Sequence, residues 1–322
     1  MERPLLSVVV PAHNEEASLP ALHRELAATL SGVTDDYELI VVDDGSTDGT
    51  SQAVRGLHRR DPRVSLIALA GNVGHQLALS AGLDAARGKA VVMMDADLQH
   101  PPSLIPDMVR LWRGGAMVVQ AVRQEAEGEP WLKRAASRLY YAVFNALSES
   151  PVRPGASDFR LLDRVAVEAL RSMKERRRML RGMVGWLRLP EAIVYYKAPA
   201  RAAGRSKYTW ARQLRMAVDG LVAFSAQPLR LALWLGLGAV ATVGAYAVYV
   251  LYIHFVTGAA LKGWSSLVLL TSFIGGVQLV ALGLIGEYLA TVYDELKARP
   301  LYLVRETIPP RSRVEARAAD ER

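Results

Sequence analysis

The sequence of 322 residues contains no cysteine. Disulfide bonds and thiolate metal sites are therefore excluded, and thiols give no indication of the redox compartment. Aromatic residues make up only 7% of the chain, yet 51% of it is hydrophobic. This apolar content is typical of a membrane part beside a globular part. The first six residues lack a basic segment followed by a long apolar run, so we expect no cleaved signal peptide.

Basic residues exceed acidic ones, which gives a formal net charge of +7 and a pI of about 9.6. Such a balance suits nucleic acid, phosphorylated substrates or an anionic membrane surface. The basic residues cluster beside the long apolar runs in the second half of the chain. We therefore expect a bilayer and a phosphorylated substrate as partners, and no nucleic acid.

The first third of the chain alternates between short apolar runs and helical patterns. The runs are Ser7–Pro11, Glu38–Val42, Val64–Leu69 and Val91–Met94. Strands that alternate with helices of this size predict an α/β fold, with a mostly parallel sheet and helices on both faces. Ligands of such sheets bind outside the carboxyl ends of the strands. The polar residues at those ends are His13, Glu15, Asp43, Asp44, Asn72, Asp95 and Asp97.

Two carboxylates, Asp95 and Asp97, follow the fourth apolar run, and a pair of prolines ends the segment. Side chains alternate along a strand, so both carboxylates are expected to point the same way. Mg²⁺ or Mn²⁺ binds through one or two such carboxylates, and substrate phosphates complete its coordination. The alternative is a polar turn after a buried strand, because an Asp-x-Asp sequence alone is common.

Further polar residues follow in the middle of the chain. The segment from 115 to 122 is typical of a strand and leads to Arg123. Asp158 precedes another apolar run, and we expect its carboxylate near the reacting centre; the alternative is a helix N-cap for the segment that follows. His75 and His100 are interpreted as hydrogen-bonding loop residues, because the carboxylates already supply a hard metal site.

Two long apolar runs lie in the second half of the chain. Leu229–Ile253 carries only Arg230, at its edge, and Ser265–Ile285 carries no charge. Each is long enough to cross a bilayer, whereas the alternative is a pair of core helices in a soluble protein. Basic residues flank the pair on both outer sides, so the positive-inside rule places both termini in the cytoplasm and the protein in the cell membrane.

These features together suit a nucleotide-sugar donor. Its diphosphate needs a divalent metal, which Asp95 and Asp97 could hold. Its base and ribose need hydrogen-bond acceptors, for which Glu15, Asp44 and the backbone near Pro11 are candidates. Positive side chains would stabilise the departing nucleoside diphosphate, and the candidates are Arg123, Arg201 and Lys207.

The acceptor is expected to be a lipid, since two spans otherwise have no evident purpose. A polyprenyl monophosphate is largely ionised at pH 7, because the second pKa of a phosphate is about 6. A strong general base is then less necessary, and Asp158 could position the acceptor or the metal. The alternative for Arg201, Arg205 and Lys207 is a basic patch attracted to anionic lipid.

Five motifs together resemble those of the family 2 glycosyltransferases. Within that family, the match is to the polyprenyl-phosphate glycosyltransferases, which include dolichyl-phosphate mannose synthases and undecaprenyl-phosphate glucose or aminoarabinose transferases. The motifs are SVVVPAHNEE at 7–16, VDDGSTDGT at 42–50, MDADLQHPP at 94–102, DFRL at 158–161 and RAAGRSKY at 201–208.

The resemblance implies a Rossmann-like GT-A domain and an inverting transfer that depends on Mg²⁺ or Mn²⁺. It implies that the nucleotide sugar is held by Pro11, His13, Glu15, Val42, Asp44, Asp95, Ala96, Gln99, Arg201 and Lys207. The implied metal residues are Asp95, Asp97 and Gln99, and the implied catalytic residues are Asp97, Arg123 and Asp158. The acceptor phosphate would bind to Arg123, Arg201, Arg205, Ser206 and Lys207. His13 stands where the family commonly has a tyrosine.

The resemblance covers nearly the whole chain and implies four parts. These are a cytoplasmic GT-A domain at 1–207, a juxtamembrane amphipathic linker at 208–228, a hairpin of two transmembrane helices at 229–288 and a cytoplasmic tail at 289–322. Two spans resemble those of the bacterial enzymes that load undecaprenyl phosphate for cell-envelope glycan modification, and a UDP-sugar is the expected donor. Transfer of mannose from GDP-mannose is the alternative.

The chain lacks the Gln-x-x-Arg-Trp motif of processive polysaccharide synthases, which favours transfer of a single sugar over polymer synthesis. A non-catalytic membrane protein is a third alternative, against which Asp95, Asp97, Arg123 and Lys207 argue. Glycines within the spans would permit a homo-oligomer such as a tetramer.

Overall fold

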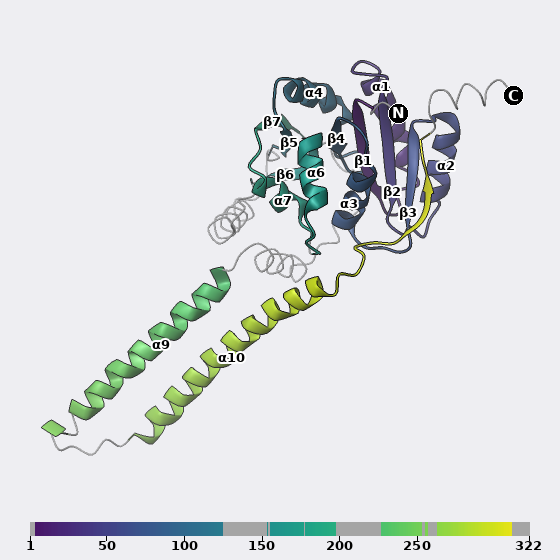
Figure 1. The fold of residues 1–322 in the computed structure, drawn as a ribbon. Helices are drawn as coiled ribbons and strands as arrows, with labels where there is room; N and C mark the ends of the chain where they lie inside the picture. Colours follow the sequence, from purple (N-terminus) through teal and green to yellow (C-terminus); the bar gives the residue numbers. More distant parts are fainter. Residues whose placement is uncertain are drawn as a thin grey trace. The chain divides into compact units, whose positions relative to one another are not determined.

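The structure is a computed structural model that describes residues 4–124, 153, 155–176, 178–197, 227–252, 255–256 and 263–310. The described residues form two units. One is an α/β unit, which the chain leaves after β7 (Glu191–Tyr196) and re-enters at Arg299 (Figure 1). The other contains two long helices, α9 (Gln227–Tyr252) and α10 (Trp264–Leu296).

Four parallel strands form the centre of the α/β unit. They are β1 (Leu6–Ala12), β2 (Tyr37–Asp43), β3 (Val64–Leu69) and β4 (Ala90–Met93), in the spatial order β4-β1-β2-β3. Every residue of these strands is buried, because helices cover both faces of the sheet. The predicted α/β fold with a mostly parallel sheet is confirmed.

The helices between these strands determine where a ligand can bind. Helices α1 (Leu19–Leu30) and α2 (Thr50–Arg60) carry the chain from β1 outward to β3, and they pack against each other. Helix α3 (His75–Ala85) then brings the chain back to β4, on the other side of β1, so the direction of winding reverses there. The crevice at the carboxyl ends of β1 and β4 is thus the expected ligand site.

The second half of the sheet adds β5 (Val118–Arg123), β6 (Ala156–Asp163) and β7 beyond β4, which completes the order β7-β5-β6-β4-β1-β2-β3-β8. Strand β6 runs antiparallel to both of its neighbours, β4 and β5. Its first residues therefore lie at the edge of the sheet where β4 ends. This reversal places Asp158, near the start of β6, at the carboxyl ends of the parallel strands.

The helices of this half follow β4 and β6. The turn η1 (Pro102–Leu104) and helix α4 (Ile105–Arg113) come after β4, and α4 packs with α1. Helix α6 (Arg164–Ser172) follows β6 and packs with α3, while α7 (Leu180–Trp186) packs with α6. The helices are thus divided between the two faces of the sheet.

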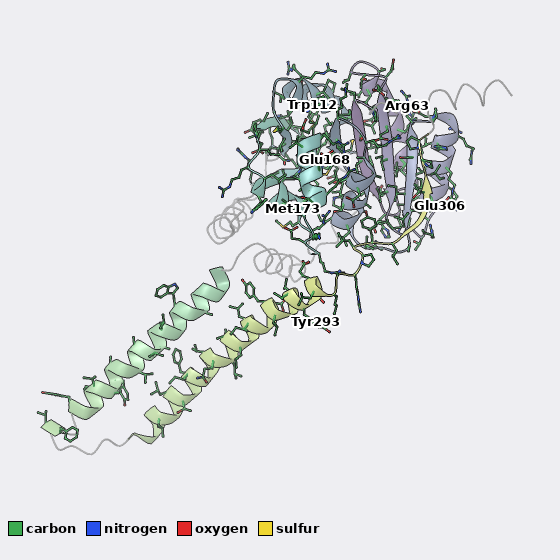
Figure 2. The ribbon with its side chains drawn as sticks, viewed as in Figure 1. Arg63, Trp112, Glu168, Met173, Tyr293 and Glu306 are labelled. Carbon is green, nitrogen blue, oxygen red and sulfur yellow. The ribbon has the colours of Figure 1, made fainter. Side chains whose placement is uncertain are left out.

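Strand β8 (Val304–Ile308) closes the far edge of the sheet by pairing antiparallel with β3. Glu306 on β8 accepts a hydrogen bond of 2.5 Å from Nη2 of Arg55 on α2, and Figure 2 shows Glu306 on this strand. Just before β8, the hydroxyl of Tyr302 donates to Oδ2 of Asp84 at 2.6 Å. This strand was not expected from the sequence, and it covers backbone groups that β3 would otherwise expose.

One segment of the helical unit could cross a membrane by length and composition. It is Phe273–Leu296 in α10, with a mean hydropathy of 1.6, and no other helix in the described part of the chain meets both criteria. In α9, the apolar stretch Gly236–Tyr249 is shorter. The predicted pair of spans is therefore not confirmed. Most of the amphipathic linker predicted at 208–228 lies outside the described residues, which resume at Gln227.

Candidate active site

The loop after β2 is fixed to the loop after β3 by Asp44, which is 4% exposed. Its Oδ1 accepts a hydrogen bond from the backbone nitrogen of Val73 at 2.7 Å, and its Oδ2 accepts one from Gly74 at 3.0 Å. Both carboxylate oxygens of this predicted nucleotide-binding residue thus bind backbone. Asp44 lies at the carboxyl edge of the sheet, as predicted. Its hydrogen bonds fix the backbone just before α3.

The loop after β1 contributes two of the other predicted nucleotide-binding residues, His13 and Glu15. His13 is exposed, and its Nδ1 lies 2.8 Å from the carbonyl oxygen of Asp44, to which it can donate. Glu15 accepts a hydrogen bond of 2.5 Å from the hydroxyl of Ser18, and burial raises the pKa of Glu15 above its ordinary value. Pro11 is buried and pairs with Val42 in the register of β1 and β2. Both residues lie near the carboxyl ends of their strands.

Gly45 allows the loops after β2 and β3 to touch. Its φ is +62°, a conformation that favours glycine, and an added Cβ would lie 2.4 Å from the carbonyl carbon of Gly71. We expect Gly45→Ala to cost at least about 1–2 kcal/mol in stability and to weaken donor binding, because the two loops must separate. Thermal unfolding and the KM for the donor would measure these two effects.

Gly71→Ala is the matched control for that substitution. An added Cβ at Gly71 would meet nothing within 4 Å, and the backbone there is not left-handed. The control should therefore leave unfolding and donor KM nearly unchanged. Equal effects of the two substitutions would contradict the tight contact inferred at Gly45.

The loop after β4 carries Asp95 and Asp97, but not as strand residues. Strand β4 ends at Met93, and Leu98 adopts a left-handed φ of +60°. The expectation that alternation along a strand aligns the two carboxylates is therefore wrong. Backbone hydrogen bonds shape this loop instead: the nitrogen of Asp95 donates to Nδ1 of His100 at 3.0 Å, and that of Gln99 donates to Oδ1 of Asp97 at 3.1 Å.

The donor atoms in this loop fit a hard divalent cation. Oδ1 of Asp95 is a buried atom without a hydrogen-bond partner among the described residues, and so is Nε2 of Gln99. Rotation of the Gln99 side-chain amide by 180° would exchange Nε2 and Oε1, so that the oxygen would occupy the position of Nε2. The described residues contain no group of three or more histidine or acidic side chains that could hold a metal. Asp95 and Asp97 would therefore need substrate oxygens to complete a coordination shell.

Asp158 is the most heavily engaged carboxylate of the site, and it is 5% exposed. Its Oδ1 accepts a hydrogen bond from Nε of Arg181 at 2.9 Å, and its Oδ2 accepts one from Nε2 of Gln76 at 2.9 Å. Burial alone would raise the pKa of Asp158, but hydrogen bonding from His75 and the charges of Arg181 and Arg160 hold that pKa well below its usual range. Asp158 is thus an anion at neutral pH.

His75, the first residue of α3, joins Asp158 to the loop after β4. Its Nε2 lies 3.3 Å from Oδ2 of Asp158 and 3.4 Å from Oδ1 of Asp95. Burial alone would lower the pKa of His75, but Asp158 and Asp95 together raise it above its ordinary value. His75 therefore brings a predicted metal carboxylate and the predicted reacting-centre carboxylate together at one imidazole.

His100 plays a different part, since it is 5% exposed and its ring stacks on Phe159 with centroids 5.1 Å apart. Its Nδ1 accepts the hydrogen bond from Asp95, and burial lowers the pKa of His100. A neutral ring is consistent with both observations. His75 and His100 both act through hydrogen bonds, as interpreted from the sequence, but His75 begins helix α3 rather than lying in a loop.

The remaining predicted residues divide between the described and undescribed parts of the chain. Arg123 is exposed at the end of β5, at the same edge as Asp95 and beside Tyr196 of β7. Ala96 is buried within the loop after β4. Arg201, Arg205, Ser206 and Lys207 lie outside the described residues.

Sequence reasoning missed two partners of Asp158, which are Gln76 and Arg181. Arg181 belongs to a strongly basic segment in which nothing distinguishes one arginine from another, and only the packing of α7 near β6 selects it. The N-cap alternative for Asp158 is wrong, because Asp158 lies within β6. The N-cap is Asp163, whose Oδ1 accepts a hydrogen bond of 2.9 Å from the nitrogen of Val165.

Known proteins resemble this chain along nearly its full length. The glucosyl transferase named SfII prophage-derived bactoprenol glucosyl transferase, from Shigella flexneri, is 32% identical over 94% of this chain and 98% of its own. An uncharacterized glycosyltransferase from Bacillus subtilis (strain 168), YkcC, is 37% identical over 94% of this chain and 93% of its own. Among solved structures, the Pyrobaculum calidifontis mannosyltransferase PcManGT, in complex with GDP-Man and Mn²⁺, is 17% identical, with a TM-score of 0.49 and coverage of 93% of this chain and 89% of its own.

The family itself is shown by the extent of these matches. The model of glycosyl transferase family 2 matches residues 7–171, which include the loops after β1, β2, β3 and β4 as well as Asp158. Every predicted site residue that the structure describes falls within this match. The chain therefore belongs to glycosyl transferase family 2 and is a glycosyltransferase.

Proposed function

We propose that this glycosyltransferase moves one sugar from a nucleotide sugar to a polyprenyl phosphate, with inversion at the anomeric carbon. The observation that carries the proposal is the convergence of Asp95 and Asp158 on Nε2 of His75, at 3.4 and 3.3 Å. A metal-binding loop and an acceptor-side carboxylate thus meet where ligands of α/β sheets bind.

The lipid acceptor is supported by two further observations. Several relatives that match over more than nine-tenths of both chains are named bactoprenol glucosyl transferases. The segment Phe273–Leu296 is also apolar and long enough to cross a membrane. We propose a second span within α9, which would give a protein of the cell membrane with both termini in the cytoplasm, as the flanking basic residues favour.

Asp95, Asp97 and Gln99 are the residues that we propose to hold Mg²⁺ or Mn²⁺ together with the donor's diphosphate. When bound there, the cation would supply positive charge to the leaving diphosphate. The buried Oδ1 of Asp95, which has no hydrogen-bond partner among the described residues, supports this assignment. Pro11, His13, Glu15, Val42, Asp44 and Ala96 line the same edge and are proposed to bind the nucleotide sugar.

Asp158 is proposed to position the acceptor side of the site rather than to remove a proton. A carboxylate whose pKa is held well below its usual range is a weak base, and Asp158 is already bound by Arg181 and Gln76. The acceptor phosphate is largely ionised at pH 7 and needs no base. One of its oxygens would form a bond to the anomeric carbon from the face opposite the diphosphate, whose bond to that carbon breaks.

The remaining assignments follow the sequence motifs. We propose a UDP-sugar as the donor, undecaprenyl phosphate as the acceptor, and Arg123, Arg201, Arg205, Ser206 and Lys207 as phosphate-binding residues. The proposed parts are the domain at 1–207, the linker at 208–228, the membrane hairpin at 229–288 and the tail at 289–322, within which β8 returns to the sheet. A homo-oligomer such as a tetramer is proposed through the glycine-bearing helices.

The test uses the full chain purified in detergent, with a panel of radiolabelled UDP- and GDP-sugars, polyprenyl phosphate and Mn²⁺. We expect an organic-soluble product that carries one sugar per lipid and that forms with a single preferred donor. Unphosphorylated polyprenol is the matched control and should yield no product. The absence of a lipid-linked sugar across the whole panel would contradict the proposal.

The same assay separates the alternatives. A GDP-mannose preference would identify a donor like that of the dolichyl-phosphate mannose synthases, and a product longer than one sugar would identify a processive synthase. Binding of donor without metal dependence and without turnover would indicate a non-catalytic membrane protein.

A further inference from the structure

A polar cavity is lined by residues of α7 and of the strands β5, β6 and β7. Its volume is about 110 Å³. Arginine is the main charged residue in its wall, which includes Arg153, Arg160, Arg181, Arg188, Gln120 and Glu191. This volume holds more than one water molecule, and it suits a small ion rather than a nucleotide or a lipid chain.

Arg160 is the buried member of this set, at 1% exposed. One of its terminal nitrogens, Nη2, donates to the carbonyl oxygen of Ser157 at 3.0 Å and lies 3.8 Å from Oδ1 of Asp158. Its Nε has no hydrogen-bond partner among the described residues. Burial lowers the pKa of Arg160 to about 10, so the side chain keeps its charge at neutral pH. A buried cation with an unused donor requires a partner.

Two carboxylates lie in or beside the cavity and pair with its arginines. Glu191 lies 3.5 Å from Arg153, with which it forms one ion pair. Asp158 serves two arginines, since it accepts from Nε of Arg181 at 2.9 Å and is also the carboxylate nearest to Arg160. Four arginines line this cavity, and Asp158 and Glu191 are carboxylates that pair with them.

We propose that this cavity is a binding site for a phosphate group. A phosphate monoester or inorganic phosphate carries between one and two negative charges at pH 7, which suits a wall whose charged residues are mainly arginines. Planar guanidinium groups bind phosphate oxygens through paired hydrogen bonds, and the unused Nε of Arg160 supplies a donor. The site requires neither the metal nor the donor sugar, and Arg160 and Arg181 connect it to Asp158 of the proposed transfer site.

Calorimetric titration of inorganic phosphate into the full chain in detergent would test this site. EDTA is included and the nucleotide sugar is omitted, so that the metal site cannot contribute. We expect saturable binding of one phosphate, and Arg160→Gln and Arg188→Gln should each weaken it by about tenfold or more. Arg188 is exposed, so Arg188→Gln is expected to fold and tests the site even where Arg160→Gln fails to fold.

Arg59→Gln is the charge-matched control, because Arg59 is exposed on α2, far along the sheet from α7. It should leave phosphate affinity unchanged, and so should Asp97→Asn. The absence of phosphate binding at millimolar concentration, or an affinity unchanged in Arg188→Gln, would overturn the assignment.

Two sources could supply the phosphate, and competition separates them. Displacement of inorganic phosphate by a short-chain prenyl monophosphate would identify the headgroup of a phosphorylated lipid as the ligand. Binding of inorganic phosphate that this lipid does not displace would identify free phosphate. Either result supports the site. Both are binding measurements that do not depend on turnover, so they can be interpreted even if the proposed sugar transfer is not observed.

Discussion

Replacing Asp97 with asparagine is expected to lower the rate of sugar transfer by at least about a hundredfold while leaving the fold intact. The side chain of Asp97 is partly exposed in the loop after β4, and its Oδ1 accepts a hydrogen bond only from the nearby nitrogen of Gln99 among the described residues. Asparagine can accept the same hydrogen bond, so the loop should keep its shape. The substitution removes one of two carboxylate charges available to a divalent cation, and losses of this size accompany the removal of one electrostatic contact to a transition state.

Binding of Mn²⁺, followed by electron paramagnetic resonance in the presence of a nucleoside diphosphate, gives a readout that does not depend on turnover. We expect the Asp97→Asn variant to bind Mn²⁺ more weakly than the unmodified chain does. Asp107→Asn is the matched control, because Asp107 is 52% exposed on α4 and pairs with Arg110. An unchanged transfer rate or an unchanged Mn²⁺ affinity in Asp97→Asn would remove the metal assignment.

The strands that build the parallel part of the sheet could be predicted from the sequence because their burial is continuous. Strand β1, for example, is buried at all seven of its residues. Its sequence is therefore a nearly continuous apolar run, which is typical of a strand buried on both faces. Strand β8 has no such signal. Its sequence is VRETI, in which Arg305 and Glu306 are charged. It lies at the edge of the sheet and pairs with β3. Edge strands are often short and charged because an exposed apolar edge would pair with other chains. Such strands are difficult to predict because they lack a continuous apolar run.

The candidate site could be predicted only in part, for a related reason. Asp95 and Asp158 were found because each adjoins an apolar run, but their proximity depends on β6 running antiparallel beside β4. His75 connects them from a third element, and no spacing along the chain indicates that it reaches both. The orientation of Asp95 and Asp97 was derived from strand geometry, which fails because the strand ends two residues before Asp95. Residue types indicated the chemistry, whereas tertiary packing determined the partners.

Asp158→Asn is expected to abolish most of the transfer activity and also to destabilise the protein by about 3–5 kcal/mol. The carboxylate is 5% exposed and is the shared anion of Arg181, Arg160 and His75. Its neutralisation leaves buried positive charge without compensation, which is a strongly destabilising change. Asp163→Asn is the matched control on the same strand, because asparagine is also a good N-cap residue, and it should cost about 1 kcal/mol or less.

The destabilisation by Asp158→Asn should depend on pH if it comes from the lost charge of Asp158. It should not depend on pH if it comes from altered packing of the side chain. The folded-state pKa of Asp158 lies below its unfolded value of about 3.9, so its contribution is present above about pH 4 and is lost as the pH falls toward the folded pKa. The folded-state pKa of His75 is raised above about 6.5, so the contribution of the His75–Asp158 pair is full below that pH and is lost as the pH rises through the folded value. The difference in melting temperature between the unmodified chain and Asp158→Asn should therefore be largest between about pH 4 and pH 6.5 and should narrow on either side. Thermal unfolding of both proteins from pH 3 to pH 9 measures this difference, and a gap that stays constant over the whole range would show that Asp158 stabilises the site by its shape rather than by its charge.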